Sequence, residues 1–300
     1  GFSSADIDLS LIAIELYRIA HTPVLLAIPR FTFAGSLLGE SNASQRLVRM
    51  TNALLGWMPG GLAVVSLTAC AFFTALTGAS GATIIALGAI LYPAMKQAGY
   101  PERFNLGLIT SSGSLGLLFP PSIALILYGV IAQQMQLEQS FTIDDLFLAG
   151  LLPGLLMLVL LIAWSMYRSV GEKIPTKAFD TKELFSAMRE SIWEMPLPFI
   201  LIGGIYSGYF AVSEAAAVAV MYVLIVDVLI LREVSIKQLP SIMRESMTLV
   251  GGVLIILGLS LASTNYLIDA QVPTKLFAFV HEHIDSKLTF LILLNIFLLV

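Results

Sequence analysis

Charged residues and cysteine are both scarce in this chain of 300 residues. Asp, Glu, Lys and Arg together make up 12% of it, whereas about 25% is usual in soluble globular proteins. Apolar side chains make up 57%, and the mean hydropathy is +0.89. So little charge cannot cover a surface exposed to water. Because backbone polar groups in lipid have to be satisfied within their own segment, the composition predicts an all-α polytopic membrane protein.

Several other classes of protein are excluded by what is missing. The single cysteine, Cys70, leaves no disulfide within the chain and no metal site built from a cysteine cluster. The net charge is −4 and the 16 Lys and Arg residues are dispersed, so we expect no nucleic-acid partner. The chain lacks an initiating Met, and its last apolar run, 288–300, is shorter than the ~20 residues of a spanning helix. We therefore expect a piece of a longer protein, cut at both ends.

The charges of the loops orient the apolar spans. Residues 168–192 contain five basic side chains, which places this loop in the cytoplasm by the positive-inside rule. Residues 133–145 contain three acidic side chains and neither Lys nor Arg, so this loop is expected outside. The spans 146–167, 197–212 and 215–231 then alternate across the bilayer without conflict.

A run of 46 uncharged residues separates Arg49 from Lys96, and the basic residues around it place both its ends in the cytoplasm. Its middle, residues 74–83, is small, rich in hydroxyl groups and punctuated by glycine. The second arm, 83–95, gives only ~20 Å of helix, which is too short to cross the bilayer. We predict a re-entrant helical hairpin whose tip lies near the middle of the membrane.

The next span is interrupted by two prolines. Pro120 and Pro121 remove two backbone donors and clash with the preceding turn, so a helix over 104–115 is expected to break and to resume over 125–132. A hairpin tip followed by an unwound segment, both uncharged, is typical of the discontinuous helices at a transporter's binding site. An amphipathic segment followed by an apolar arm occurs at 44–73 and again at 273–300, which indicates a weak internal repeat truncated in its second half. We expect the amphipathic segments 8–20 and 44–55 to lie along the interface.

The tip sequence Thr77–Gly81 allows more than one interpretation. Its hydroxyl groups and freed carbonyls can coordinate a hard cation such as Na⁺. Alternatively, Gly-Ala-Ser-Gly matches the G-x-S-G of rhomboid-like intramembrane serine proteases, but that reaction needs a base and the three histidines all lie in polar or amphipathic segments. In the simplest interpretation, the small residues only allow helices to approach closely.

Three polar residues outside the hairpin also need an explanation. Ser213 can cap a helix that starts at Glu214, whose carboxylate favours the positive end of the helix dipole; whether this turn also binds an ion is left open. Asp227 is close enough to the end of its span to snorkel. Arg30 lies in an apolar run, where a subunit or lipid contact is one possibility and its role is left open.

Six segments carry a resemblance to a known family. They are, in chain order, L-L-A-I-P at 25–29, N-A-L-L-G-W-M-P-G-G-L-A at 52–63, F-F-T-A-L-T-G-A-S at 72–80, L-Y-P-A-M-K-Q-A-G-Y-P at 91–101, L-F-P-P-S-I at 118–123 and S-E-A-A-A at 213–217. Together they resemble the large membrane (M, DctM-like) subunit of tripartite ATP-independent periplasmic (TRAP) transporters, over nearly the whole chain.

The resemblance implies an elevator-type secondary transporter rather than an enzyme, with Na⁺ as coupling ion and no cofactor. It implies import of organic acids, of the carboxylate or sialic acid class, through a bacterial inner membrane. The implied partners are a small TRAP membrane subunit, a periplasmic substrate-binding protein and the lipid bilayer. An ion-coupled carrier that has hairpins but needs no binding protein is the alternative.

Carried over by position, the resemblance places a cation site at Thr77, Gly78 and Ser80 of the tip. The carbonyls of Gly116, Phe119 and Pro121 are its counterpart across the cavity. Ser111 and Ser112 match positions that line the same cavity, and Ser213 and Glu214 are further candidates for the substrate cavity. The family's T-P-T-E is Ala211-Val-Ser-Glu214 here, so an ion ligand at Ala211 could only be its carbonyl. Arg30 replaces an expected apolar residue.

The same resemblance divides the chain into four parts. Residues 1–56 are expected to hold interfacial helices and a scaffold span, and residues 57–135 the first transport-domain hairpin with the broken helix. Residues 136–245 are expected to form scaffold spans around the cytoplasmic basic loop. Residues 246–300 are expected to add a span, an interfacial helix and the start of a second hairpin, whose G-M-F-M-D motif, like the later T-P-P, lies beyond Val300.

Overall fold

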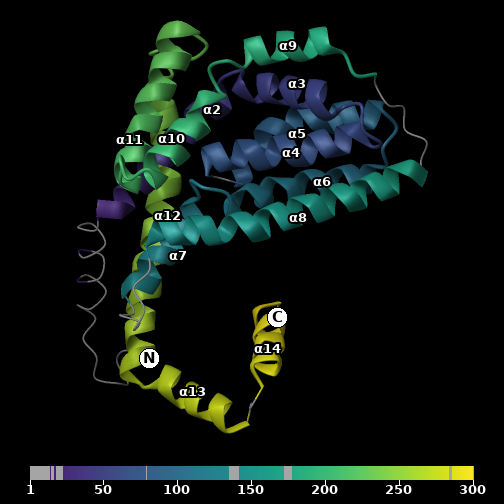
Figure 1. Cartoon of the computed structure of the whole chain (residues 1–300). Coiled ribbons are helices and arrows are strands. Elements are labelled where there is room, and N and C mark those ends of the chain that lie inside the picture. Colours follow the sequence, from purple (N-terminus) through teal and green to yellow (C-terminus); the bar gives the residue numbers. More distant parts are fainter. Residues whose placement is uncertain are drawn as a thin grey trace. The chain divides into compact units, whose positions relative to one another are not determined.

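The structure is a computed structural model that describes residues 14, 17, 23–78, 80–134, 142–171, 178–283 and 286–299. Every regular element in this part of the chain is a helix, which confirms the all-α class (Figure 1). The chain divides into two compact units, Thr22–Val250, and Gly1–His21 with Gly251–Val300. The first unit contains both the predicted hairpin and the predicted break. The expected interfacial segment 8–20 lies outside the described residues, apart from residues 14 and 17.

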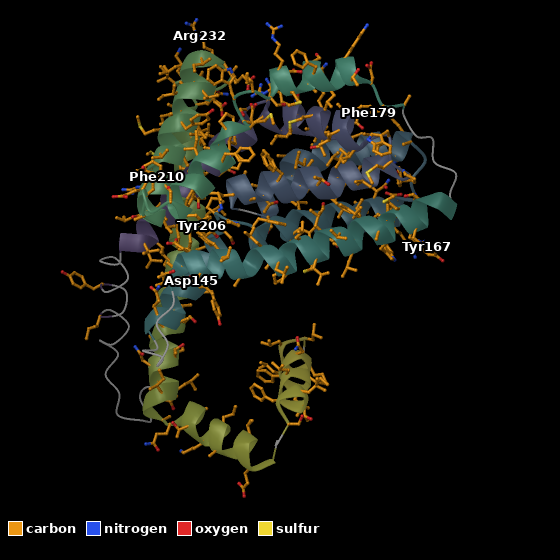
Figure 2. All side chains as sticks on the ribbon, viewed as in Figure 1. Asp145, Tyr167, Phe179, Tyr206, Phe210 and Arg232 are labelled. Carbon is orange, nitrogen blue, oxygen red and sulfur yellow. The ribbon has the colours of Figure 1, made fainter. Side chains whose placement is uncertain are left out.

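The helices long and apolar enough to cross a membrane confirm a multi-pass membrane protein. Three such segments are Ile143–Ser169 in α8 (Ile143–Gly171), Val212–Ile230 in α11 (Val212–Val223) with η4 (Leu224–Ile230), and Leu239–Ile268 in α12 (Leu239–Asp269). Asp145 and Tyr167 mark the two ends of α8, and between them many apolar side chains point away from the protein (Figure 2). The expected spans 146–167 and 215–231 are therefore present as helices, whereas the expected span 197–212 is only the 11-residue helix α10 (Pro196–Tyr206).

Helix α4 (Gly61–Thr77) forms the centre of the larger unit. It contacts α3 (Ala43–Leu55), α5 (Ser80–Gln97), α6 (Glu102–Leu115) and α8, which run alongside it (Figure 1). The sequence of α4 is apolar on all sides, and a helix of this kind is stable only when it is covered all round. Val65, Leu67, Cys70 and Phe73 of α4 are accordingly 0% exposed.

Helix α2 (Ala27–Glu40) links this bundle to α11. It packs mainly against α11, and Arg30 of α2 donates a hydrogen bond of 2.8 Å from Nη1 to the carbonyl of Ser213. The structure thus gives the half-buried Arg30 a partner within the chain. The N-terminal cap of α11 is Ala211 rather than Ser213, which corrects the sequence prediction: the Glu214 carboxylate accepts the backbone N–H of Ala211 at 3.0 Å, so the cap is made by the acidic side chain one turn later.

A buried ion cluster ties α3 to two turns distant in sequence. Arg46 of α3 forms salt bridges with Glu194, between α9 (Thr181–Glu190) and α10, and with Glu233, between η4 and α12. Burial raises the pKa of Glu194 above its ordinary value, although Arg46 acts in the opposite direction. Burial also acts to raise the pKa of Glu233, but hydrogen bonds from Arg46 and the Asn42 backbone outweigh it and hold that pKa below its usual value. This cluster is called the Arg46 clamp below.

One further expectation is corrected in this part of the chain, and one predicted loop gains detail. Asp227 is 1% exposed, so its side chain does not snorkel. It is enclosed because the turn that carries Glu233 folds back over the end of η4. In this turn the Glu233 N–H donates a hydrogen bond to the Asp227 carbonyl. The expected basic loop contains α9, which begins after Asp180, whose side chain accepts the Lys182 N–H at 2.9 Å.

The smaller unit holds α13 (Val272–His283) and α14 (Lys287–Leu299). These helices occupy the positions expected for the second amphipathic segment and the second apolar arm. The internal repeat and the four-part division of the chain stay predictions.

Candidate functional site

The hairpin predicted from the uncharged run is present. Helix α4 ends at Thr77, and Gly78 follows with φ +67°, the left-handed conformation that glycine adopts without strain at a helix C-terminus. Its N–H donates to the Thr74 carbonyl at 2.7 Å, and α5 begins at Ser80. The second arm is longer than predicted, because α5 starts at the tip itself, runs through Pro93 and is 18 residues long in all.

The predicted break of the following span is also present. Helix α6 ends at Leu115, a 3₁₀ turn (η3) covers Gly116–Leu118, and α7 (Ile123–Gln134) resumes at an angle of 45°. Between them, Phe119 is extended and Pro120 and Pro121 are joined by a cis peptide bond. Ser122 lies just before α7, and its hydroxyl accepts the Leu125 N–H at 3.3 Å. Ser122 is not among the predicted site residues, although a serine directly before an apolar helix signals a cap.

The tip of the hairpin and the break lie against each other. A Cβ placed on Gly116 would come within 2.3 Å of the Thr74 Cβ and 2.6 Å of the Ala71 carbonyl oxygen. A Cβ placed on Gly78 would come within 2.9 Å of the Ile123 side chain, at the start of α7. Gly116 therefore needs to be glycine because a Cβ would collide with α4, including its backbone, whereas Gly78 needs to be glycine because of its positive φ.

Four helix ends meet at this contact. The C-termini of α4 and α6 leave carbonyls without partners in their own helices, whereas the N-termini of α5 and α7 leave N–H groups. Carbonyl ends favour cations and N–H ends favour anions. No group of three or more His, Cys, Asp or Glu side chains suited to a metal ion occurs among the described residues. A cation held here would therefore be bound by neutral oxygens.

The predicted cation ligands lie on the two segments that form this contact, and their joint role stays a prediction. Thr77 and Gly78 are buried, and Ser80 is the half-buried first residue of α5. The Thr77 hydroxyl lies 3.3 Å from the Thr83 hydroxyl. In the break, the Gly116 carbonyl accepts the Phe119 N–H at 3.1 Å and keeps a second lone pair.

The residues predicted for the substrate cavity are not brought together. Ser111 and Ser112 differ in exposure: Ser111 is exposed, whereas Ser112 is buried and its hydroxyl donates to the Ile109 carbonyl at 3.0 Å. Ser213 and Glu214 belong to α11, whose main contacts are with α2 and α10.

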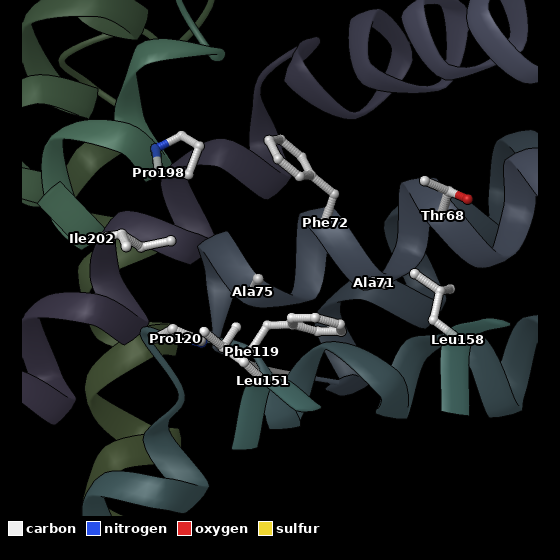
Figure 3. Close-up of a pocket in the computed structure, with 10 residues that line it drawn as sticks. All are labelled: Thr68, Ala71, Phe72, Ala75, Phe119, Pro120, Leu151, Leu158, Pro198 and Ile202. Atoms are coloured by element: carbon white, nitrogen blue, oxygen red, sulfur yellow. The ribbon is translucent and has the colours of Figure 1, made fainter. Parts of the chain in front are cut away.

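An apolar cavity of about 190 Å³ adjoins the break. Figure 3 shows it between α4, the break, α8 and α10. Its lining residues are Thr68, Ala71, Phe72, Ala75, Phe119, Pro120, Leu151, Leu158, Pro198 and Ile202. None of the four predicted cavity residues contributes to it. With one hydroxyl side chain among ten, this cavity is not suited to a charged substrate.

The family of the chain is decided by its sequence match. Residues 2–300 match the family described as "Tripartite ATP-independent periplasmic transporter, DctM component". The chain belongs to this family.

Individual relatives agree with the match. A C4-dicarboxylate TRAP transporter large permease protein DctM of Rhodobacter capsulatus is 31% identical, covering 99% of this chain and 70% of the relative.

Two further relatives carry other substrates in their names. The ectoine/5-hydroxyectoine TRAP transporter large permease protein UehC of Ruegeria pomeroyi is 36% identical, covering 84% of this chain and 58% of its own length. The isethionate TRAP transporter permease protein DctMQ of Oleidesulfovibrio alaskensis is 32% identical, covering 94% of this chain and 44% of its own length. The chain thus spans between 44% and 70% of the length of these three TRAP permeases. Because they are named as transporter permeases, the protein is not an enzyme, and the protease interpretation of Gly78–Gly81 is set aside.

Proposed function

We propose that this chain is part of the large membrane subunit of a Na⁺-coupled secondary transporter that imports organic acids. The observation that carries the proposal is the contact between the hairpin tip and the helix break, described above at Gly78 and Gly116. Helix interruptions at membrane depth are tolerated only where protein or a wet cavity surrounds them, and their freed backbone groups form the ion and substrate sites of many transporters.

In this proposal the tip and the break share the coupling ion. The hydroxyls of Thr77 and Ser80 and the carbonyls of Gly116, Phe119 and Pro121 supply neutral oxygens, as a hard cation requires. The N-termini of α5 and α7 add partial positive charge beside them, which favours an anionic group of the substrate. Organic anions are the proposed substrates, with carboxylates and sialic acid as the class; relatives are named for C4-dicarboxylates and isethionate.

The transport mechanism and the assembly are part of the same proposal. The hairpin and the broken helix move together as an elevator against the scaffold helices. A small TRAP membrane subunit and a periplasmic substrate-binding protein complete the transporter in the bacterial inner membrane. The carrier that needs no binding protein is the alternative.

Uptake into liposomes tests this function. The full-length protein, with both partner proteins, is reconstituted and given a radiolabelled C4-dicarboxylate under an inward Na⁺ gradient or an equal K⁺ gradient. We expect accumulation with Na⁺ only, and none when the binding protein is omitted. Accumulation that is driven by ATP without Na⁺ would exclude the proposal, and Na⁺-driven accumulation without the binding protein would favour the alternative carrier.

A further inference from the structure

We propose that Thr74 and Thr83 are positioning residues, which hold the hairpin tip in register with the C-terminus of α6 and thereby set the geometry of the cation site. This inference rests on the proposed function, because it assigns these two hydroxyls a role in Na⁺ binding at the neighbouring tip. Neither residue is among the ligands carried over from the family resemblance.

The geometry joins three helices through one side chain. The Thr74 hydroxyl of α4 lies 2.9 Å from the Thr83 hydroxyl of α5 and 3.0 Å from the Gly113 carbonyl of α6. Both threonines are 0% exposed. The Thr77 hydroxyl, at the tip, lies 3.3 Å from Thr83 and extends the network to the predicted cation ligands.

These oxygens bond to one another rather than forming an ion site of their own. Separations of 2.9 and 3.0 Å are the lengths of ordinary hydrogen bonds, and a hydroxyl already bonded in this way to a carbonyl is saturated as a donor. Gly113 lies in the last turn of α6, where carbonyls lack a partner within the helix, so Thr74 supplies a donor that the helix itself cannot.

The network fixes the position of the tip because α6 and α5 are packed closely together beside it. A Cβ on Gly113 would come within 2.4 Å of the Ile84 side chain and 3.4 Å of the Ser80 carbonyl oxygen, so α6 and the first turn of α5 are already in contact. A change in the Thr74 bonds therefore shifts Thr77 and Ser80 relative to the carbonyls of the break. Cation affinity falls steeply with such shifts, because each ligand acts only at its own bond length.

The test compares Thr74→Val and Thr83→Val, which keep the shape and remove the hydroxyl, with Thr74→Ser, which keeps the hydroxyl. Thr51→Val is the matched control, because Thr51 is also buried but its hydroxyl bonds only to the Leu47 carbonyl of its own helix, α3. The full-length transporter with both partners is assayed for the Na⁺ concentration that gives half-maximal uptake. The thermal unfolding midpoint is measured with and without Na⁺.

The expected result is specific to Na⁺. Thr74→Val and Thr83→Val should each raise the half-maximal Na⁺ concentration about fivefold, as the loss of one buried hydrogen bond predicts. They should also shrink the Na⁺-induced rise of the unfolding midpoint, whereas Thr74→Ser and Thr51→Val keep both near wild type. The double variant should be less than additive, because both changes break the same bond.

Two outcomes overturn the inference. If wild type depends on Na⁺ but Thr74→Val and Thr51→Val lower the unfolding midpoint alike and leave the half-maximal Na⁺ concentration unchanged, Thr74 only stabilises the fold while the proposed function stands. If wild-type uptake itself is independent of Na⁺, the proposed function and this inference fail together.

Discussion

At the scale of single residues, the site depends on glycines, whose lack of a side chain lets neighbouring helices approach closely. Gly35 of α2 faces the hairpin tip, and a Cβ there would come within 2.5 Å of the Thr77 carbonyl oxygen and 2.6 Å of its Cα. Helices in a membrane gain little from burying apolar surface against each other, so close approach through small residues is what holds them. Gly35 therefore lets α2 pack directly against the backbone of the tip.

Gly35→Ala is predicted to impair uptake more than Gly39→Ala. The added methyl group collides with backbone, which cannot rotate away, so we expect a loss of stability of about 1–3 kcal/mol and a displaced tip. Gly39 lies on the same helix with nothing within 4 Å of an added Cβ, so its substitution should be neutral or slightly stabilising. Thermal unfolding and Na⁺-driven uptake of the two variants check this, and equal effects would refute the assigned contact.

At the scale of elements, the Arg46 clamp holds α3 against the turns before α10 and after η4. The side chain of Arg46 is 8% exposed and that of Glu194 is 2% exposed, so these charges stabilise the structure only as a set. Asp227 is 1% exposed and lies in the same region, close enough to interact with the charges of Arg46, Glu194 and Glu233. Together, the Arg46 clamp and Asp227 place three acidic side chains around one guanidinium.

Arg46→Met is predicted to destabilise the protein strongly, and Asp227→Asn is not. Removing the guanidinium leaves Glu194 and Glu233 without their cation, at a cost of about 3–5 kcal/mol. Asp227→Asn removes one of three acidic charges around a single guanidinium, so it should leave the unfolding midpoint unchanged or raise it. Thermal unfolding in detergent measures both, with Arg244→Met at an exposed position as the control. A midpoint for Arg46→Met equal to that of the control would contradict the role of the clamp.

Local sequence signals predicted the hairpin and the break but not the contacts between them. Glycine at the tip and two prolines in the break determine the local backbone conformation, so both helix interruptions can be located from sequence. The bond from Thr74 to Gly113 and the burial of Asp227 depend on segments far apart in the chain. For the same reason, the sequence could not predict that Ser112 is buried and Ser111 exposed, because the neighbours of α6 are set by the fold.

At the scale of the whole molecule, the account has one central claim: the tip and the break form one site for Na⁺. The most direct measurement is the Na⁺ dependence of uptake by the full-length transporter carrying Ser80→Ala. Ser66→Ala is the control, because Ser66 lies in the N-terminal part of α4, away from the tip, and its hydroxyl donates to the Leu62 carbonyl. We predict that Ser80→Ala raises the half-maximal Na⁺ concentration about tenfold, as expected for the loss of one oxygen from a charged partner, and that Ser66→Ala leaves it unchanged. The same half-maximal Na⁺ concentration in wild type and in both variants would contradict the claim.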